Sequence, residues 1–339
     1  MHELVRHADM PVPRWHGLRV MAIDGSTLRM PALAALREHF GGFTTSAGSF
    51  RGLARSAMLY EVATGFIHDA VIGSYAKDER SLSEGLWDHL TSDHLLLLDR
   101  GFPSFVWFGG LLQRGIPFCA RIDPKRWKQI GEFARSSARD AIVTLKPSQA
   151  VQSKLRSSCA DSSPITVRVV KDVLPSGEQL VLVTSLLDPA IPYADLVALY
   201  QWRWRIEEGF KHLKSRLQLE NWTGRSVVTI QQDFYAKHFL ASCAALLAFA
   251  ASEPAGNLQE SIKLSPSGWR IKPNLTYTQS LLKHRLPQLL LAIGSISSCV
   301  KQIIELVSSS PEYTRPNRRY PRDLGVRIFD YHSAYKPCA

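Results

Sequence analysis

The sequence predicts an α/β fold that carries a β-rich insertion and ends in a helical C-terminal region. Short apolar runs typical of strands fill the first third of the 339 residues, and four consecutive leucines at 95–98 are typical of a strand buried on both faces. From Tyr193 onward, apolar residues recur with helical spacing. The length and the 45% hydrophobic content fit one large core with an insertion, or two domains, and exclude a disordered chain.

The first part of the core is expected over residues 1–120, where short strands precede a helix. The first strand is an apolar run closed by Asp24, and the leucine strand stops abruptly at Asp99. Two predicted strands therefore end in an aspartate. The expected elements are strands at 18–24, 56–64, 65–74 and 95–98 and a helix at 79–90.

Residues 121–188 differ in composition from the preceding segment, which predicts a β-rich insertion. A polar stretch leads into two β-branched runs, at 165–173 and 178–187. The Leu-Pro-Ser-Gly segment between them contains the residues that turns favour. We therefore expect these two runs to form a hairpin.

The rest of the chain reads as mostly helical. Residues 189–250 are expected to complete the core, and residues 251–339 to form a helical C-terminal region with a basic, proline-containing tail at 315–329. The longest apolar stretch, at 239–251, is shorter than the roughly 18 to 20 residues that span a bilayer. We interpret it as a buried helix.

The charge balance points to a polyanionic partner. The chain has 41 Lys and Arg against 30 Asp and Glu, which gives a formal net charge of +11 and a pI near 9.5. Nucleic acid is the first candidate for such a partner. From charge alone, a basic surface that only aids solubility explains the surplus equally well.

The cysteines and the first residues indicate a reducing, intracellular setting. The five cysteines are an odd number, widely scattered and without a Cys-x-x-Cys pair, so neither a disulfide framework nor a zinc site is indicated. Charges and prolines stand where a signal peptide would carry an apolar core. A cytoplasmic protein is the expectation.

One predicted helix, over residues 194–217, gathers the chemically informative side chains. At about 100° per residue, and with Tyr200 set at zero, Arg203, Glu207 and Lys214 fall at roughly 300°, 340° and 320°. Lys211 falls near 20° on the same face. An apolar stripe lies next to this face, so the helix should pack on a core while its polar face points into a cleft. The stripe consists of Leu199, Ile206, Phe210, Leu213 and Leu217.

A simpler reading treats these charges as ordinary pairs four residues apart, each worth a few tenths of a kcal/mol on a solvated face. That reading explains poorly why the charges border the apolar stripe. Two aspartates at strand ends and a glutamate on a packed helix are instead the hard oxygen ligands that two Mg²⁺ ions need for phosphoryl transfer. Cations beside them would neutralise DNA phosphates.

Two short motifs and one longer signature carry a family resemblance. Asp24 lies in AIDGSTLRMP and Asp99 in LLLLDRGFPSF, and YQWRWRIEEGFKHLKS follows them in the chain. Its Tyr200, Arg203, Glu207 and Lys214 are separated by two, three and six residues. Over nearly the whole chain, this order resembles the DDE transposases of bacterial insertion sequences, in the insertion sequence four family with its Y-R-E-K signature.

The resemblance implies a fold, a site and an activity. The separations of 75 and 108 residues between the three carboxylates (99 − 24 and 207 − 99) suit a ribonuclease-H-like core whose insertion precedes the glutamate helix. Family membership implies metal-dependent cleavage at transposon ends and strand transfer into target DNA by a homodimer near the bacterial nucleoid. By this resemblance Asp24, Asp99 and Glu207 bind two Mg²⁺ or Mn²⁺ ions, while Tyr200, Arg203, Lys214, Lys211 and Arg121 contact DNA.

Alternatives stay open on the sequence alone. A DNA-binding remnant without activity and a ribonuclease-H-like nuclease that cuts without joining are the rival functions. Glu208 is a disfavoured substitute for Glu207, because at about 80° it leaves the phosphate-binding face. Since Asp24 lies so near the start, we also expect that an amino-terminal end-recognition domain is missing from this chain. No Walker loop, His-Glu-x-x-His or Gly-x-Ser-x-Gly motif occurs.

Overall fold

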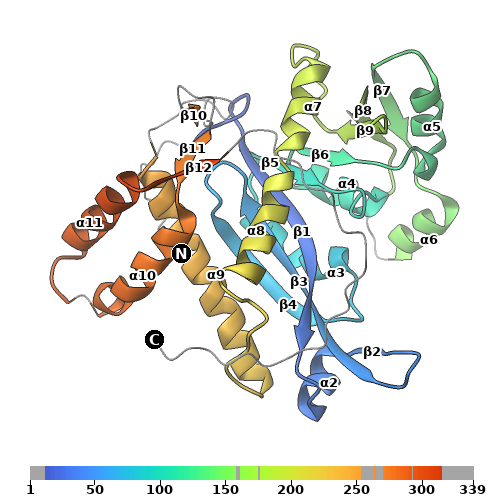
Figure 1. Ribbon diagram of the computed structural model, residues 1–339. Helices are drawn as coiled ribbons and strands as arrows, with labels where there is room; N and C mark the ends of the chain where they lie inside the picture. The colour runs from blue at the N-terminus through green and yellow to red at the C-terminus, as the bar shows by residue number, and fades with distance from the viewer. Residues whose placement is uncertain are drawn as a thin grey trace.

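A large mixed β-sheet forms the centre of the molecule (Figure 1). The computed structural model describes residues 12–157, 161–174, 176–252, 263–264, 270–291 and 293–314. The sheet has nine strands in the order β2-β3-β1-β5-β6-β9-β8-β7, with β4 paired to β3. The strands are β1 (Arg19–Met30), β2 (Gly42–Thr44), β3 (Phe50–Glu61), β4 (Ile67–Ser74), β5 (His94–Leu98), β6 (Phe118–Arg121), β7 (Asp140–Leu145), β8 (Ile165–Val173) and β9 (Gln179–Thr184).

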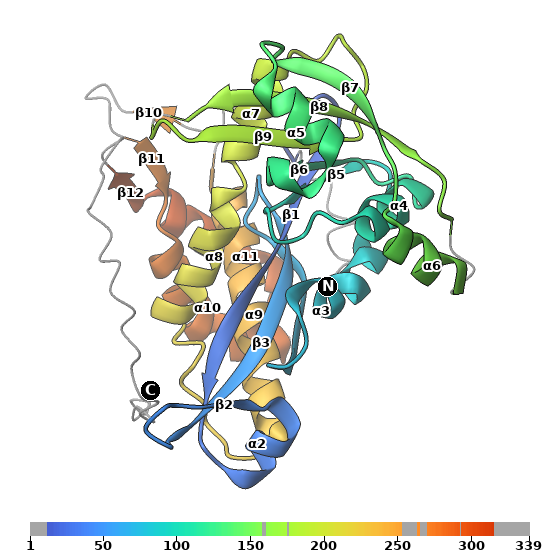
Figure 2. The same ribbon diagram turned by 90° about the vertical axis from the view of Figure 1, so that its right-hand side faces the viewer.

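Strands β1, β3, β4, β5 and β6 combine an antiparallel meander with three parallel strands. β1 pairs with β3, and β3 with β4, in antiparallel fashion. On its other side β1 runs parallel to β5, which runs parallel to β6. The two runs that were expected to meet near residue 64 are the hairpin of β3 and β4. β1 and β3 also continue far beyond β5 to a small lobe formed by β2 and α2 (Ala34–Phe40), as Figure 2 shows.

The β-rich segment after residue 121 extends the same sheet. β9 pairs with β6 in antiparallel fashion, and β8 and β7 follow in turn. The expected hairpin between residues 165–173 and 178–187 is confirmed, because β8 and β9 pair in antiparallel register around the turn. The inserted strands are therefore hydrogen-bonded to the core sheet.

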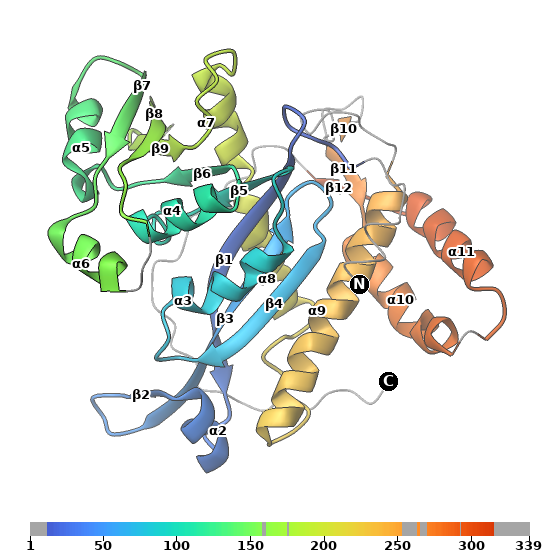
Figure 3. The same ribbon diagram turned by 180° about the vertical axis from the view of Figure 1, so that it is seen from behind.

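Helices cover both faces of the sheet. α7 (Tyr193–Gln201), α8 (Trp204–Ser215) and α9 (Val227–Ala250) contribute to the hydrophobic cluster on one face. The other face, seen from behind in Figure 3, is covered by a second set. That set comprises α3 (Glu79–Ser83), the 3₁₀ helix η1 (Glu84–His89), α4 (Phe105–Gln113), η2 (Pro124–Arg126), α5 (Lys128–Arg135) and α6 (Gln149–Ser157).

The strand β5 joins the two hydrophobic clusters. All five of its residues are buried, as the run of leucines predicts for a central strand. Leu95 and Leu97 pack with the α8 side, and Leu96 and Leu98 pack with the α4 side. Alternation along the strand thus sends every second side chain to each layer.

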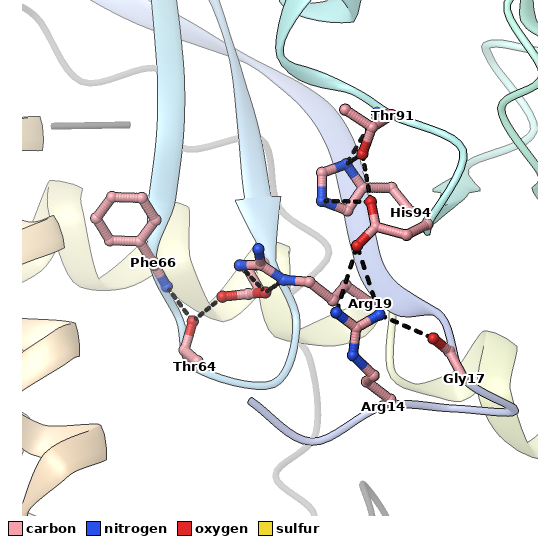
Figure 4. Close-up of polar contacts among 9 residues, drawn as sticks. Arg14, Gly17, Arg19, Thr64, Phe66, Thr91 and His94 are labelled. Atoms are coloured by element: carbon pink, nitrogen blue, oxygen red, sulfur yellow. Dashed lines mark hydrogen bonds and ion pairs between the residues drawn. The ribbon is translucent and has the colours of Figure 1, made fainter. Parts of the chain in front are cut away.

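A buried ion pair holds the start of β1 against the end of β3. Arg19 donates from Nε to Glu61 Oε1 at 2.7 Å, and the Glu61 side chain is completely buried. Thr64 donates its hydroxyl to the second oxygen of Glu61 at 2.7 Å and accepts from the backbone N–H of Phe66. Figure 4 shows this network beside a second, more exposed one that joins Arg14 to the turn before β5.

The C-terminal part is built on α9, the single helix that contains most of the expected buried segment 239–251. Within the described part of the chain, no helix is both long and apolar enough to cross a membrane. α10 (Leu275–Leu290) packs on α9, and α11 (Ile296–Ser308) follows it. A small sheet, which the helical prediction missed, joins β10 (Lys263–Leu264), β11 (Arg270–Pro273) and β12 (Pro311–Thr314). The predicted basic tail at 315–329 lies outside the described residues.

Candidate active site

Asp24 and Asp99 meet where the parallel strands β1 and β5 stop pairing. The last register pair is Ile23 with Leu98, so each aspartate is the next residue along its own chain. Neighbouring strands lie about 4.8 Å apart, which brings the two positions side by side. The prediction that both aspartates end strands is correct for Asp99 only. β1 runs on to Met30, because β3 continues to pair with it on the opposite edge.

The predicted continuous helix over residues 194–217 is instead two helices, α7 and α8, interrupted at Trp202 and Arg203. Backbone hydrogen bonds of the i to i−3 type run through the junction, among them Arg203 N–H to Tyr200 O at 3.1 Å and Ile206 N–H to Arg203 O at 3.1 Å. Such bonds are those of a 3₁₀ turn, which is tighter than an α-helix. The angular positions predicted for one continuous α-helix therefore do not relate the residues of α7 to those of α8.

Arg203 lies at the centre of the three predicted carboxylates. Its Nη2 donates to Glu207 Oε1 at 2.5 Å, its Nη1 lies 3.4 Å from Asp24 Oδ2, and its Nε lies 3.9 Å from Asp99 Oδ1. The arginine side chain is only 11% exposed. Three carboxylates from β1, the end of β5 and α8 thus converge on one guanidinium.

Tyr200 connects α7 to the end of β5. Its hydroxyl lies 3.3 Å from the carbonyl oxygen of Leu98, to which it donates, and 3.4 Å from Asp99 Oδ1. Burial raises the pKa of the phenol far above its usual range, so the side chain stays protonated and acts as a donor. The contact links the Tyr200 hydroxyl to the Asp99 carboxylate.

The carboxyl group of Asp24 is poorly solvated. Burial is the main cause that raises its pKa to about 6, and the negative charges of Asp99 and Glu79 act in the same direction. A hydrogen bond from the backbone N–H of Gly25 and the charge of Arg203 oppose this rise. Asp24 therefore holds its proton more tightly than an exposed aspartate does.

The raised pKa predicts a pH-dependent gain in stability for Asp24→Asn. Because the folded-state pKa lies above the usual 3.8, ionisation of Asp24 lowers the free energy of unfolding. This loss of stability is absent below about pH 4 and complete above about pH 6. At about 1.4 kcal/mol per pKa unit, the full cost is about 3 kcal/mol. With a chelator present, urea unfolding should show Asp24→Asn more stable than the parent at pH 8 and this gain should vanish toward pH 4.

The matched control is Asp88→Asn, which removes the charge of an exposed aspartate. Its effect on the free energy of unfolding should be small and should not change between pH 4 and pH 8. An equal or larger gain for Asp24→Asn at pH 4 would contradict the assigned cause.

The other predicted site residues lie further from the carboxylates. Lys214 donates from Nζ to the backbone oxygen of Thr27 at 2.7 Å, and burial lowers its pKa. Lys211 and Glu208 are exposed on α8. Arg121, at the end of β6, forms an ion pair with Glu178.

Glu79 is a carboxylate that the sequence analysis missed. It accepts from Arg55 Nη1 at 3.1 Å, and it packs so closely on Gly25 that a Cβ there would lie 2.6 Å from Glu79 Cδ. The glycine directly after Asp24 is the only sequence signal for this contact, because a side chain at that position would displace Glu79. Glu79 approaches β1 from the α3 side.

The chemistry of the donors fits a hard divalent cation. Asp24, Asp99 and Glu207 supply carboxylate oxygens, the ligands that Mg²⁺ and Mn²⁺ prefer. Among the described residues, no three carboxylate, histidine or cysteine side chains are close enough to hold a metal ion as they stand. The guanidinium of Arg203 lies between the three carboxylates instead.

Comparison with known proteins matches this chain to transposases. The transposase DDE domain family matches residues 15–243. The transposase InsG for insertion sequence element IS4 of Escherichia coli (strain K12) is 25% identical over 346 aligned positions, covering 97% of this chain and 73% of InsG. Among solved structures, the piggyBac transposase synaptic complex with hairpin DNA aligns with a TM-score of 0.46 and 10% identity, over 85% of this chain and 57% of that chain.

Proposed function

Because the chain belongs to the family of transposase DDE domains, we propose that Asp24, Asp99 and Glu207 are its catalytic carboxylates. As a member of this family, the chain is a DNA transposase that cleaves and transfers DNA strands. The observation that carries the proposal is the convergence of the three carboxylates on Arg203 from three separate elements. Replacing a buried ion cluster with apolar residues is often neutral or stabilising, so stability alone does not account for this arrangement. It is typical of a site that handles cations and phosphates.

The family uses divalent metal ions, and we propose Mg²⁺ or Mn²⁺ held by these three carboxylates. A bound metal would supply Lewis-acid activation of a water or a 3′-hydroxyl and charge stabilisation at the transferring phosphate. The protein's part is to bring the carboxylates together. Tyr200 orients Asp99, the backbone N–H of Gly25 holds one oxygen of Asp24, and α8 presents Glu207.

DNA is the partner, and we propose that the cations near the carboxylates contact its phosphates. Arg203 and Tyr200 lie directly at the site, Arg121 lies close enough for its charge to act on Tyr200, and Lys211 is exposed on α8. Lys214 uses one of its three N–H donors on the Thr27 carbonyl, which leaves two donors for a phosphate. Such contacts bind DNA without reading its sequence. The protein is proposed to act as a homodimer on the two ends of the transposon.

The strand order supports a ribonuclease-H-like core, which we propose as the finer fold class. Three antiparallel strands, β4, β3 and β1, are followed across the sheet by the parallel strands β5 and β6. The first aspartate lies on the central strand and the second after its parallel neighbour. Within this proposal residues 1–120 and 189–250 form the core, 121–188 the insertion and 251–339 the C-terminal region.

The test is a strand-cleavage assay with the full chain and a duplex that ends in the inverted repeats of the encoding insertion sequence. We expect 3′-end cleavage and joining to a target plasmid in the presence of Mg²⁺ or Mn²⁺, and neither product with EDTA. Cleavage without joining would favour the nuclease alternative. Metal-independent cleavage would contradict the assigned site.

A further inference from the structure

We infer that the Arg203 guanidinium competes with the divalent metal for the three carboxylates. The guanidinium must leave them before a metal ion binds. This inference rests on the function proposed above, because it takes Asp24, Asp99 and Glu207 as the metal ligands. It goes further by giving Arg203 a second position and by making metal affinity depend on that residue. Arg203 is then a positioning residue for the carboxylates as well as a candidate phosphate contact.

The geometry of the guanidinium carries the inference. Three different nitrogen atoms of Arg203 face three different carboxylates: Nη2 faces Glu207 at 2.5 Å, Nη1 faces Asp24 at 3.4 Å and Nε faces Asp99 at 3.9 Å. The carbon at the centre of the guanidinium therefore lies between all three ligands. A planar cation of this size keeps the oxygens around it apart.

A metal ion needs the same carboxylates at much shorter range. Mg²⁺ binds its oxygen ligands at about 2.0 to 2.1 Å and demands near-octahedral geometry. These carboxylate oxygens cannot close to that distance around a metal ion while the guanidinium lies between them. Metal and arginine therefore exclude each other, and the free energy of moving Arg203 weakens the apparent metal affinity.

The contacts of Arg203 are incomplete, which makes its departure feasible. Its contact with Glu207 is a short hydrogen bond, but its Nε is buried without a hydrogen-bond partner and lies 3.9 Å from Asp99. Buried donors are normally paired, so this nitrogen favours a second arrangement. The residue also sits in the 3₁₀ junction between α7 and α8, a kind of irregularity that often marks a mobile point in a helix. Once displaced, a guanidinium can bind a phosphate in bidentate fashion.

The experiment is a Mn²⁺ titration of the full chain without DNA, in which free Mn²⁺ is followed by electron paramagnetic resonance. We expect Arg203→Gln to bind Mn²⁺ about tenfold more tightly than the parent, because the competitor is gone. Arg216→Gln is the matched control. It removes one positive charge from an exposed site at the C-terminal end of α8, and it should change the affinity by no more than about threefold.

A second readout separates tighter binding from misfolding. Because a ligand stabilises the state that binds it, Mn²⁺ should raise the melting temperature of Arg203→Gln more than that of the parent. If Arg203→Gln does not fold, Arg203→Lys provides the test. The point charge of lysine cannot bridge three carboxylates, so this variant should also bind Mn²⁺ more tightly than the parent. Equal affinity in the folded Arg203 variant and the parent would show a permanent structural clamp and overturn the inference.

Asp24→Asn distinguishes this inference from the proposed function. If Asp24→Asn weakens Mn²⁺ binding while the Arg203 variant matches the parent, the metal site stands and only the competition is refuted. If Asp24→Asn binds Mn²⁺ as the parent does, the proposed metal ligands themselves are wrong.

Discussion

Glu207→Gln should abolish strand cleavage while DNA binding stays nearly unchanged. Glutamine has the size of glutamate and suits a helix, and the Glu207 side chain is 34% exposed, so α8 should fold normally. The loss removes one proposed metal ligand. Changes around metal ligands already cost 10-fold to 100-fold, so we expect the cleavage rate to fall by more than about a hundredfold. Cleavage of a labelled end duplex in Mg²⁺ measures the effect.

Glu208→Gln is the control for this prediction. Glu208 is the next residue on the same helix and has the same chemistry, but its exposed side chain makes none of the contacts with Arg203. Its cleavage rate should stay within about twofold of the parent, as for ordinary surface substitutions. Equal losses at both positions would show that the orientation of α8 is assigned wrongly.

Glu61→Ala should produce the largest loss of stability. It removes a completely buried carboxylate and leaves the positive charge of Arg19, which is only 15% exposed, without its partner. Breaking a buried pair from one side costs about 3 to 5 kcal/mol, and Thr64 also loses its acceptor. Since small proteins are stable by only about 5 to 15 kcal/mol, urea unfolding should show a large fall in the midpoint.

The exposed pair of Lys128 and Glu132 provides the comparison. The two side chains are 86% and 55% exposed and lie 3.9 Å apart. Glu132→Ala should change the free energy of unfolding by less than about 1 kcal/mol. A similar small change for Glu61→Ala would mean that solvent reaches Arg19 more freely than the packing indicates.

The strand that ends before Asp99 could be predicted from the sequence because its cause is local. A buried run of leucines is typical of a central strand, and this one stops at Asp99. The continuation of β1 beyond Asp24 could not be predicted in this way. It depends on β3, whose pairing with Thr27 and Met30 is a tertiary contact that no short segment encodes.

The break between α7 and α8 also has no local signal. Gln201, Trp202 and Arg203 all tolerate a helix, and neither glycine nor proline lies there. Contacts from outside the segment act on it instead. Arg205 donates to the carbonyl oxygen of Val62 at 2.9 Å and stacks over Trp202 at 4.1 Å.

The pairing of β9 with β6 has a mechanical consequence for the whole molecule. Since β6 also pairs with β5, an unbroken ladder of backbone hydrogen bonds links the inserted strands to the strand that Asp99 follows. β7, β8 and β9 cannot rotate as a separate unit unless these hydrogen bonds break. A displacement of β9 would therefore act through β6 on the strand that Asp99 follows.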